Sequence, residues 1–295
     1  MVAGLSSRFA PISYEKPKPL IPVRGEILVE RQIRQLLERG ISEIILVTGY
    51  QAEQFAWLGK KYGITLVENK EYLVRNNHSS IYAAREYLDN SYICSGDNYF
   101  VKNPFREQEE ESCYAALFSP GETGEWCLQT DEEDWITGIE IGGSNQWYMM
   151  GHVFWSREFS QKFLEILKKV YDESATRNKL WEDIYREHMD ELHMKMKRYG
   201  EGEIFEFDSL DELRDFDPVY WKRSGSVVME HLADLLNCEE GDLTGLKPLK
   251  DGRGRVVGVA FSLRGINYRY EYQSGTVGGT DVLGALKRED GITLL

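Results

Sequence analysis

The sequence predicts an α/β protein: a doubly wound, mostly parallel sheet with helices on both faces, followed by a small C-terminal α+β appendage. Two observations lead to this fold class. Strand and helix patterns alternate up to about residue 216, and the strand runs are almost continuously apolar, as expected when helices cover both faces. With 295 residues, of which 42% are hydrophobic, the chain can form one large and one small domain. We expect them at residues 1–222 and 223–295.

The elements of the large domain follow from hydrophobic spacing and from glycines at helix ends. Residues 29–39 place Ile33, Leu36 and Leu37 on one helical face, and Gly40 ends that helix. In doubly wound sheets, ligands bind beyond the carboxyl ends of the strands, so polar residues after strands are candidate site residues. The expected strands are 43–50, 64–68, 91–95 and 203–208, and the expected helices are 29–39, 54–62, 79–88 and 210–216.

The C-terminal residues predict a small α+β module of unknown role, which could serve docking or a homodimer or be the remnant of a fusion. An amphipathic helix is expected at 226–236 and a connection at 243–249. Residues 256–263 and 268–272 are β-rich and flank Gly265, so they predict a hairpin. The Gly-rich stretch 275–284 lacks a phosphate-loop lysine and is interpreted as a flexible end.

Charge and cysteine content exclude several classes of protein. The formal net charge of -14 argues against a nucleic-acid binder, whose surface would be basic. The four cysteines form no CxxC pair, and the sequence contains no signal peptide and no long apolar span. These features predict a cytoplasmic protein with reduced cysteines and no membrane partner.

The N-terminal segment has the composition of a triphosphate-binding loop. Small residues let backbone N–H groups approach phosphate oxygens, and serine hydroxyls add donors. Arg8 can then bind phosphate oxygens in bidentate fashion, whereas Lys18 acts as a point charge between prolines that hold its backbone extended. The spacing fits neither a Walker loop nor a Rossmann fingerprint. The candidate loop residues are Ala3, Gly4, Leu5, Ser6 and Ser7, and the candidate catalytic residues are Arg8 and Lys18.

These residues resemble the signature of the nucleotidyltransferase superfamily. The run from Ala3 to Phe9, followed by Pro11-Ile12 and Pro17-Lys18, looks most like bacterial CTP:phosphocholine cytidylyltransferases, and the resemblance covers roughly residues 1–216. It implies a Rossmann-like nucleotidyltransferase fold, CTP and phosphocholine as substrates, CDP-choline and pyrophosphate as products, and Mg²⁺ as cofactor. Members of this family have a strand of five or six apolar residues before the loop. Here only Met1 and Val2 precede it, so we expect either a very short first strand or a start further upstream.

Two aspartates are candidate ligands of Mg²⁺. Asp97 follows the strand at 91–95 after Gly96, and Asp208 ends the strand at 203–208. Each also has an ordinary interpretation, Asp97 as a turn residue and Asp208 as a helix N-cap. The resemblance places the two metal-binding carboxylates of the family at these positions. Mg²⁺ keeps several waters, so two carboxylates and phosphate oxygens complete its ligand set.

Polar residues after other strands are candidates for the base and ribose. Asn77 and Ser79 belong to a run of six polar residues that leads into a helix, and an N-cap accounts for only one or two of them. An equivalent Asn-rich segment lies near the nucleotide in the resembled family. Gln51 follows the end of the strand at 43–50 and is a further candidate. We interpret His78, in the same run, as a surface residue.

The acceptor site is predicted from aromatic residues beside acids. A quaternary ammonium cannot donate a hydrogen bond, so a protein holds it with aromatic faces and nearby carboxylates. The resemblance matches Trp126 and Trp181 to tryptophans of the choline pocket. Core packing is the competing explanation for any one ring. The candidate choline-binding residues are Trp126, Tyr148, Trp181, Glu182 and Asp183.

Two other functions remain open at this point. Sugar-1-phosphate nucleotidyltransferases share the fold and the first motif, although they generally need polar groups for sugar hydroxyls where this chain has tryptophans. A non-catalytic nucleotide-binding regulator would also keep the fold, but it has no need of Arg8, Lys18, Asp97 and Asp208 together.

Overall fold

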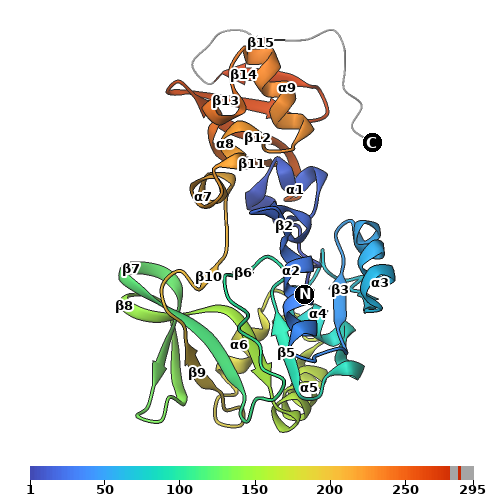
Figure 1. Cartoon of the computed structure of the whole chain (residues 1–295), viewed down its shortest axis with the longest axis vertical. Coiled ribbons are helices and arrows are strands. Elements are labelled where there is room, and N and C mark those ends of the chain that lie inside the picture. The colour runs from blue at the N-terminus through green and yellow to red at the C-terminus, as the bar shows by residue number, and fades with distance from the viewer. Residues whose placement is uncertain (280–284, 287–295) are drawn as a thin grey trace. The chain divides into compact units, whose positions relative to one another are not determined.

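The computed structural model describes residues 1–279 and 285–286, and the described chain divides into two compact units. Unit 1 comprises Met1–Gly4 and Glu26–Glu206, and unit 2 comprises Leu5–Gly25 and Phe207–Leu295. Figure 1 traces the chain through both. The division differs from the predicted boundary at residue 222, because residues 5–25 and 207–222 associate with the C-terminal module. Each unit is described separately below.

Unit 1 has the predicted α/β class, with parallel strands at its centre. β3 (Ile45–Thr48) runs parallel to β4 (Thr65–Glu68), and the backbone of residues 1–3 hydrogen-bonds to β3. A second sheet has the strand order β5 (Ser91–Cys94), β8 (Ile136–Trp155), β7 (Cys113–Thr130) and β9 (Lys195–Arg198), in which β7 and β9 are parallel. The short strands β6 (Tyr99–Phe100) and β10 (Ile204–Phe205) pair with each other.

The helices of unit 1 confirm the predicted pattern. In α2 (Leu28–Glu38), Leu28, Val29 and Ile33 are buried, and Gly40 follows with a positive φ of 77° that favours glycine. The other predicted helices are each divided between an α-helix and a 3₁₀ turn. Their bounds are η3 (Ala52–Phe55), α3 (Ala56–Tyr62), α4 (His78–Ala83) and η4 (Arg85–Tyr87), and the later helices are α5 (Arg157–Val170) and α6 (Trp181–Glu187).

A long hairpin, which the sequence did not predict, dominates the second half of unit 1. It consists of β7 (Cys113–Thr130) and β8 (Ile136–Trp155), and β8 pairs with β5 (Ser91–Cys94) on its other side. Register shifts interrupt the β7–β8 ladder at several points, including Thr123/Trp126. Such irregularities redirect side chains locally. The main core lies between this sheet and helices α5 and α6, with β9 (Lys195–Arg198) completing the sheet.

Unit 2 contains a five-stranded antiparallel sheet. The order is β11-β12-β13-β14-β15, with β12 (Val256–Leu263) and β13 (Ile266–Glu271) forming the predicted hairpin. The expected connection at 243–249 is instead the strand β11 (Thr244–Lys250), which pairs with β12. Residues 276–279 of the expected flexible end form β14 (Thr276–Gly279), whereas 280–284 lie outside the described residues. β15 is Ala285–Leu286, and the helices are α7 (Leu210–Phe216), α8 (Val219–Lys222), α9 (Val227–Leu236) and η5 (Glu240–Asp242).

The N-terminal part of unit 2 packs on the C-terminal module. It contains η1 (Ser7–Phe9), α1 (Ile12–Glu15), η2 (Lys18–Leu20) and β1 (Pro22–Val23), and β2 (Glu26–Ile27) follows in unit 1. The rings of Tyr14 and Tyr272 lie 4.3 Å apart between centroids. Figure 1 shows α1, in blue, beside the orange elements of this module. The C-terminal module therefore holds the segment that carries Arg8 and Lys18.

Glu15 makes the most specific of these contacts. Its carboxylate accepts hydrogen bonds from the Ser226 hydroxyl at 2.6 Å and from the backbone N–H groups of Val227 and Val228 at 2.8 and 2.9 Å. These donors belong to the first turn of α9, where a helix leaves N–H groups without intrahelical partners.

The variant Glu15→Gln is expected to lower the free energy of unfolding by about 1 to 2 kcal/mol, because an amide oxygen replaces a charged acceptor at the start of a helix. Urea unfolding followed by circular dichroism measures the change. Lys16→Ala is the matched control, since Lys16 is exposed next to Glu15. Equal stability of the two variants would show that the Glu15 contacts contribute nothing.

Two further features concern membrane-spanning helices and the state of the cysteines. Among the described residues, no helix is both long and apolar enough to span a bilayer. Cys94, Cys113, Cys127 and Cys238 are all free, and burial raises the pKa of the Cys94 thiol to about 12 and that of Cys113 to about 11. A raised pKa keeps a thiol protonated at neutral pH, which fits a structural role.

Candidate active site

The first part of the predicted phosphate loop is fixed in unit 1. The Ala3 carbonyl accepts a hydrogen bond from the backbone N–H of Tyr50, and the turn after β3 approaches it closely. A Cβ at Gly49 would lie 2.9 Å from the Ala3 oxygen, so this position requires glycine. Gly4 follows as an exposed residue with open space around it. The backbone here is accessible, as a phosphate-binding loop needs.

The second part of the loop lies in unit 2. Ser6 has a left-handed backbone with φ 46°, and the 3₁₀ turn η1 starts at Ser7, while Leu5 is exposed. The Arg8 guanidinium forms an ion pair with the Asp208 carboxylate at 2.5 Å, and both side chains remain accessible to solvent. The structure thus brings one predicted catalytic residue to one predicted metal ligand.

Lys18 is buried, in contrast to the exposed Lys16 nearby. Only 5% of Lys18 is accessible, and its ammonium group lies 5.9 Å from the centroid of the Phe9 ring. Pro17 and Pro19 are buried on either side of it. A lysine held in this way has a fixed position, which is what a point charge aimed at one phosphate requires.

Asp97 lies in unit 1 at the carboxyl end of β5, half-buried in the turn 95–98. Gln32 of α2 fixes this turn, because its side-chain amide donates to the carbonyls of Ser95 and Asn98, each at 2.8 Å. The backbone N–H of Gly96 donates to the Met1 carbonyl, so Asp97 and the start of the loop share one edge of the parallel strands. This is the edge at which ligands bind in such sheets.

The chemistry of the two aspartates fits Mg²⁺, which prefers carboxylate oxygens. Asp97 belongs to unit 1 and Asp208 to unit 2. Within the described residues, no group of three or more histidine, cysteine or acidic side chains forms a metal-sized cluster. The assignment of Mg²⁺ to these two aspartates stays a prediction.

The predicted nucleotide contacts differ in their surroundings. Gln51 has a left-handed backbone and donates to the Tyr50 hydroxyl at 3.1 Å, beside Ala3. Ser79 is only 1% accessible; its hydroxyl donates to the Asn76 carbonyl and accepts from Asn69. Its hydroxyl is therefore engaged within the fold. Nucleotide contacts by these residues stay predictions.

Asn77 connects the polar run after β4 to the predicted acceptor residues. Its side-chain N–H donates to a Glu182 carboxylate oxygen at 3.0 Å, and its side-chain oxygen accepts from the Trp181 backbone N–H at 2.7 Å. The Tyr114 hydroxyl donates to the other Glu182 oxygen at 3.2 Å. Asn77 thus fixes both the start of α6 and the orientation of the Glu182 carboxylate.

Glu182 has an unusual protonation equilibrium. Burial raises the pKa of its carboxyl group to about 7, and the hydrogen bonds from Asn77 and Tyr114 reduce this shift only in part. A carboxyl group with a pKa near neutrality is typical of functional sites. A bound cation would favour its charged form.

Acidic side chains also lie near the rings of Tyr114 and Tyr148. Burial raises the pKa of Tyr148, and the charges of Glu125 and Glu206 add to the effect. Burial likewise raises the pKa of Tyr114, and the charges of Glu182 and Glu206 add to that shift. Tyr148 lies opposite Cys127 in the β7–β8 ladder, next to Trp126. We call this group the acidic aromatic cluster, and it consists of Tyr114, Glu125, Trp126, Tyr148, Glu182 and Glu206.

The remaining predicted acceptor residues support the cluster. Trp181 is 1% accessible and stacks on Tyr114 with ring centroids 5.7 Å apart, while its other neighbours are core rings. Asp183 accepts from the Leu180 backbone N–H at 2.8 Å and pairs with Arg186, whose guanidinium lies 5.2 Å from the Trp126 ring centroid. Trp181 and Asp183 therefore contribute to the core and to the helix start, respectively.

Sequence reasoning missed Tyr114, Glu125 and Glu206. Glu206 lies two residues before Asp208 in the alternating strand, so its position carried a signal, and Asn98 donates to its carboxylate at 3.1 Å. No local sequence pattern distinguishes Tyr114 from the other tyrosines. The prediction that His78 is a surface residue was wrong, because it is fully buried with Nδ1 2.7 Å from the Lys179 carbonyl.

Comparison with protein families finds a match at the N-terminal part of the chain. Residues 1–140 match the MobA-like NTP transferase domain. Among curated proteins, the 2-aminoethylphosphonate cytidylyltransferase of Lancefieldella rimae is 35% identical over 224 residues, which are 75% of this chain and 91% of that protein. The choline-phosphate cytidylyltransferase of Streptococcus pneumoniae is 32% identical over 219 residues, which are 74% of this chain and 96% of that protein.

Solved structures agree with these relatives. The CTP:phosphocholine cytidylyltransferase of Streptococcus pneumoniae superposes with a TM-score of 0.71 at 32% identity, covering 74% of this chain and 96% of that one. The inositol-1-phosphate CTP transferase of T. maritima is similar in fold alone, with a TM-score of 0.56 at 20% identity. The two curated relatives share the transferred nucleotide and differ in the acceptor.

Proposed function

This chain belongs to the nucleotidyltransferase superfamily as a cytidylyltransferase, and on that premise we propose that it transfers CMP from CTP to phosphocholine. The products are CDP-choline and pyrophosphate. One observation supports this acceptor above all: three carboxylates and three aromatic side chains form the acidic aromatic cluster within unit 1. Rings and carboxylates attract a quaternary ammonium without needing a hydrogen bond from it.

The transfer requires little covalent chemistry from the protein. A phosphate oxygen of phosphocholine attacks the α-phosphorus of CTP, the bond between the α-phosphorus and its bridging oxygen breaks, and pyrophosphate leaves with those electrons. A phosphomonoester is largely ionised at neutral pH, so no general base is needed. Positioning and charge neutralisation then supply the rate enhancement.

Arg8 and Lys18 carry the positive charge in this proposal. Lys18 provides a fixed ammonium group, because it is held among buried neighbours, while the accessible Arg8 can exchange its Asp208 partner for phosphate oxygens. Asp97 and Asp208 would hold Mg²⁺ through carboxylate oxygens. When bound, the metal would neutralise phosphate charge.

The acceptor is held by its cationic end. Glu182, oriented by Asn77 and Tyr114, would contact the ammonium in its ionised form, and Trp126 and Tyr148 would offer ring surface. A second candidate acceptor is 2-aminoethylphosphonate. It is favoured by the hydrogen-bonding oxygens of Glu182, since a primary ammonium donates to a carboxylate and a quaternary one cannot.

We expect pyrophosphate release only with CTP and an acceptor that carries an ammonium group. The assay crosses CTP, UTP, ATP and dTTP with phosphocholine, 2-aminoethylphosphonate and glucose-1-phosphate in the presence of Mg²⁺. The highest kcat/KM with phosphocholine would support the proposal. A higher kcat/KM with 2-aminoethylphosphonate would instead identify this second candidate as the acceptor. Turnover with glucose-1-phosphate would contradict the cation site, and the absence of turnover with every pair would favour a nucleotide-binding regulator.

A further inference from the structure

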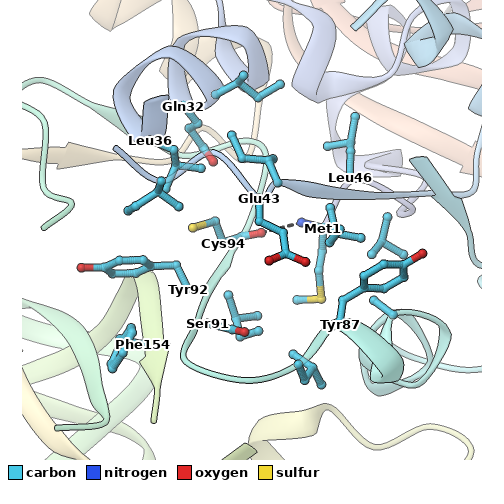
Figure 2. A pocket seen from close by; sticks show the side chains of 18 of the residues that line it. Met1, Gln32, Leu36, Glu43, Leu46, Tyr87, Ser91, Tyr92, Cys94 and Phe154 are labelled. Atoms are coloured by element: carbon cyan, nitrogen blue, oxygen red, sulfur yellow. Dashed lines mark hydrogen bonds between the residues drawn. The ribbon is translucent and has the colours of Figure 1, made fainter. Parts of the chain in front are cut away.

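The N-terminal part of the chain is divided between the two units. Residues 1–4 belong to unit 1, where the Met1 amino group donates to the Cys94 carbonyl at 2.6 Å, as Figure 2 shows. Residues 5–25 belong to unit 2 and carry both of the proposed catalytic cations. We call residues 5–25 the phosphate segment. Contacts within unit 2 therefore determine how these cations are held.

The first of these contacts lies at Arg8. Its guanidinium pairs with Asp208, which directly precedes Ser209, the N-cap of α7. The turn η1, which contains Arg8, lies against β11. Phe9, at the end of η1, is 2% accessible. The start of the phosphate segment is thus attached both to the beginning of α7 and to the antiparallel sheet.

The second contact lies at Tyr14 and Glu15, shortly before Lys18. The Glu15 carboxylate binds the first turn of α9 through the Ser226 hydroxyl and the next two backbone N–H groups. A carboxylate at this end of a helix is favoured by the helix dipole. The Tyr14 ring lies against Tyr272, which follows β13 and is 7% accessible. These two residues attach the phosphate segment to the helix and to the sheet of the C-terminal module.

The third contact lies beyond Lys18, at the end of the phosphate segment. The Tyr220 hydroxyl donates to the Pro22 carbonyl, and the Asp217 carboxylate accepts from the Arg24 backbone N–H at 2.6 Å. Lys18 therefore lies between two attachments, and both are made within unit 2.

The C-terminal module is an addition to the enzyme that the relatives represent. The two curated relatives match about three quarters of this chain and more than nine tenths of their own length. Both α9 and β13 lie after residue 216, beyond the part of the chain that resembles cytidylyltransferases. Ordering a charged segment costs conformational entropy, which contacts with a folded surface offset. The module provides such a surface for the phosphate segment.

We propose that the C-terminal module is a positioning domain for the cytidylyl transfer proposed above, that it folds with the phosphate segment as one cooperative unit, and that Glu15 is the positioning residue that joins the two. The module then keeps Arg8 and Lys18 ordered for the triphosphate. The phosphate segment and the module should open together, and a weaker contact at Glu15 should slow transfer in a protein that remains folded.

Amide hydrogen exchange of the full chain tests the cooperative unit without any substrate. Glu15→Gln is compared with Glu230→Gln, because Glu230 is an exposed carboxylate on α9. We expect Glu15→Gln to accelerate exchange at least about fivefold, and by the same factor, at Ile21 in the phosphate segment and at Cys238 after α9. Both N–H groups donate to backbone carbonyls. Exchange at Thr65 in unit 1 should not change.

Tyr272→Leu is a second variant, which weakens the same contact from the side of the module. It should accelerate exchange at Ile21, although the two residues are far apart in the sequence. Faster exchange in the phosphate segment alone, or in the module alone, would overturn the cooperative unit. Exchange at Ile21 and Cys238 that is equal in Glu15→Gln and Glu230→Gln would overturn it as well.

Steady-state kinetics test the positioning role. In Glu15→Gln, kcat with CTP and phosphocholine should fall at least about fivefold, because a less tightly held Lys18 is less precisely placed. KM for phosphocholine should change less than about twofold, since the residues assigned to the ammonium lie in unit 1. Glu230→Gln should have the kcat of the unchanged chain.

A merely structural contact at Glu15 would lower stability and leave kcat of the folded protein unchanged, and this result would overturn the positioning role. If the unchanged chain does not transfer CMP at all, the function proposed above is overturned. Hydrogen exchange then decides by itself whether the phosphate segment and the module form one unit.

Discussion

Replacing Lys18 with alanine is expected to reduce kcat/KM for cytidylyl transfer by about 10²- to 10³-fold, because the substitution removes a fixed positive charge from the transferring phosphate. Lys18 is 5% accessible and lies near Phe9 between two buried prolines, so its ammonium group does not have to be ordered during the reaction. Initial rates of pyrophosphate release with CTP and phosphocholine measure the effect.

Lys16→Ala separates this effect from a general loss of charge. Lys16 lies two residues away and is exposed, so its removal should change kcat/KM less than about threefold if only a local, ordered charge matters. Thermal unfolding of both variants reports whether the fold persists. A folded Lys18→Ala protein with the activity of the unchanged chain would remove Lys18 from the mechanism.

The second large effect is expected at Glu182. In Glu182→Gln the amide keeps much of the shape and hydrogen-bonding capacity of the side chain but loses its charge. We expect KM for phosphocholine at pH 8 to rise at least about tenfold, with a smaller change in kcat, since a desolvated interaction with a cation is lost. Glu187→Gln is the matched control, because Glu187 is an exposed carboxylate on the same helix. An unchanged KM would exclude Glu182 from acceptor binding.

The pH dependence gives an independent test of Glu182. Its pKa of about 7 means that the carboxyl group is neutral below and charged above that pH, so affinity for a cationic acceptor should rise as pH increases through 7. The phosphate of the substrate also titrates near pH 6. Comparing the unchanged chain with Glu182→Gln at each pH separates the titration of Glu182 from that of the substrate phosphate, because both proteins bind the same substrate. If the affinity of both proteins for the acceptor rises in the same way with pH, Glu182 does not bind the cation.

The stability of the free protein should show the opposite trend. A carboxyl group whose pKa is raised by folding binds more protons in the folded state, so its contribution to stability is full at low pH and is lost as pH rises through 7. In the Glu182→Gln protein, this loss of stability with rising pH should not occur. A site that weakens the free fold at the pH where it binds a cation is typical of function rather than packing.

The sequence alone determined the fold class and several of the local elements. The periodicity of residues 29–39, the apolar run 43–50 and the glycines that end helices report on backbone geometry within one element, which needs no knowledge of distant contacts. α2, β3 and β5 accordingly lie where they were predicted. The position of Asp97 after β5 followed in the same way, because a strand end is a local feature.

Only the tertiary structure decided which residues meet. Asn77, Tyr114, Glu182 and Glu206 come from four separate segments that only the tertiary structure brings together, and one of them lies in the β7–β8 hairpin with its register shifts. No local pattern specifies such a register shift. The burial of His78 and Lys18 and the attachment of residues 5–25 to the C-terminal module have the same origin. Periodicity determines which face of an element is apolar, whereas long-range packing determines what that face and its polar neighbours contact.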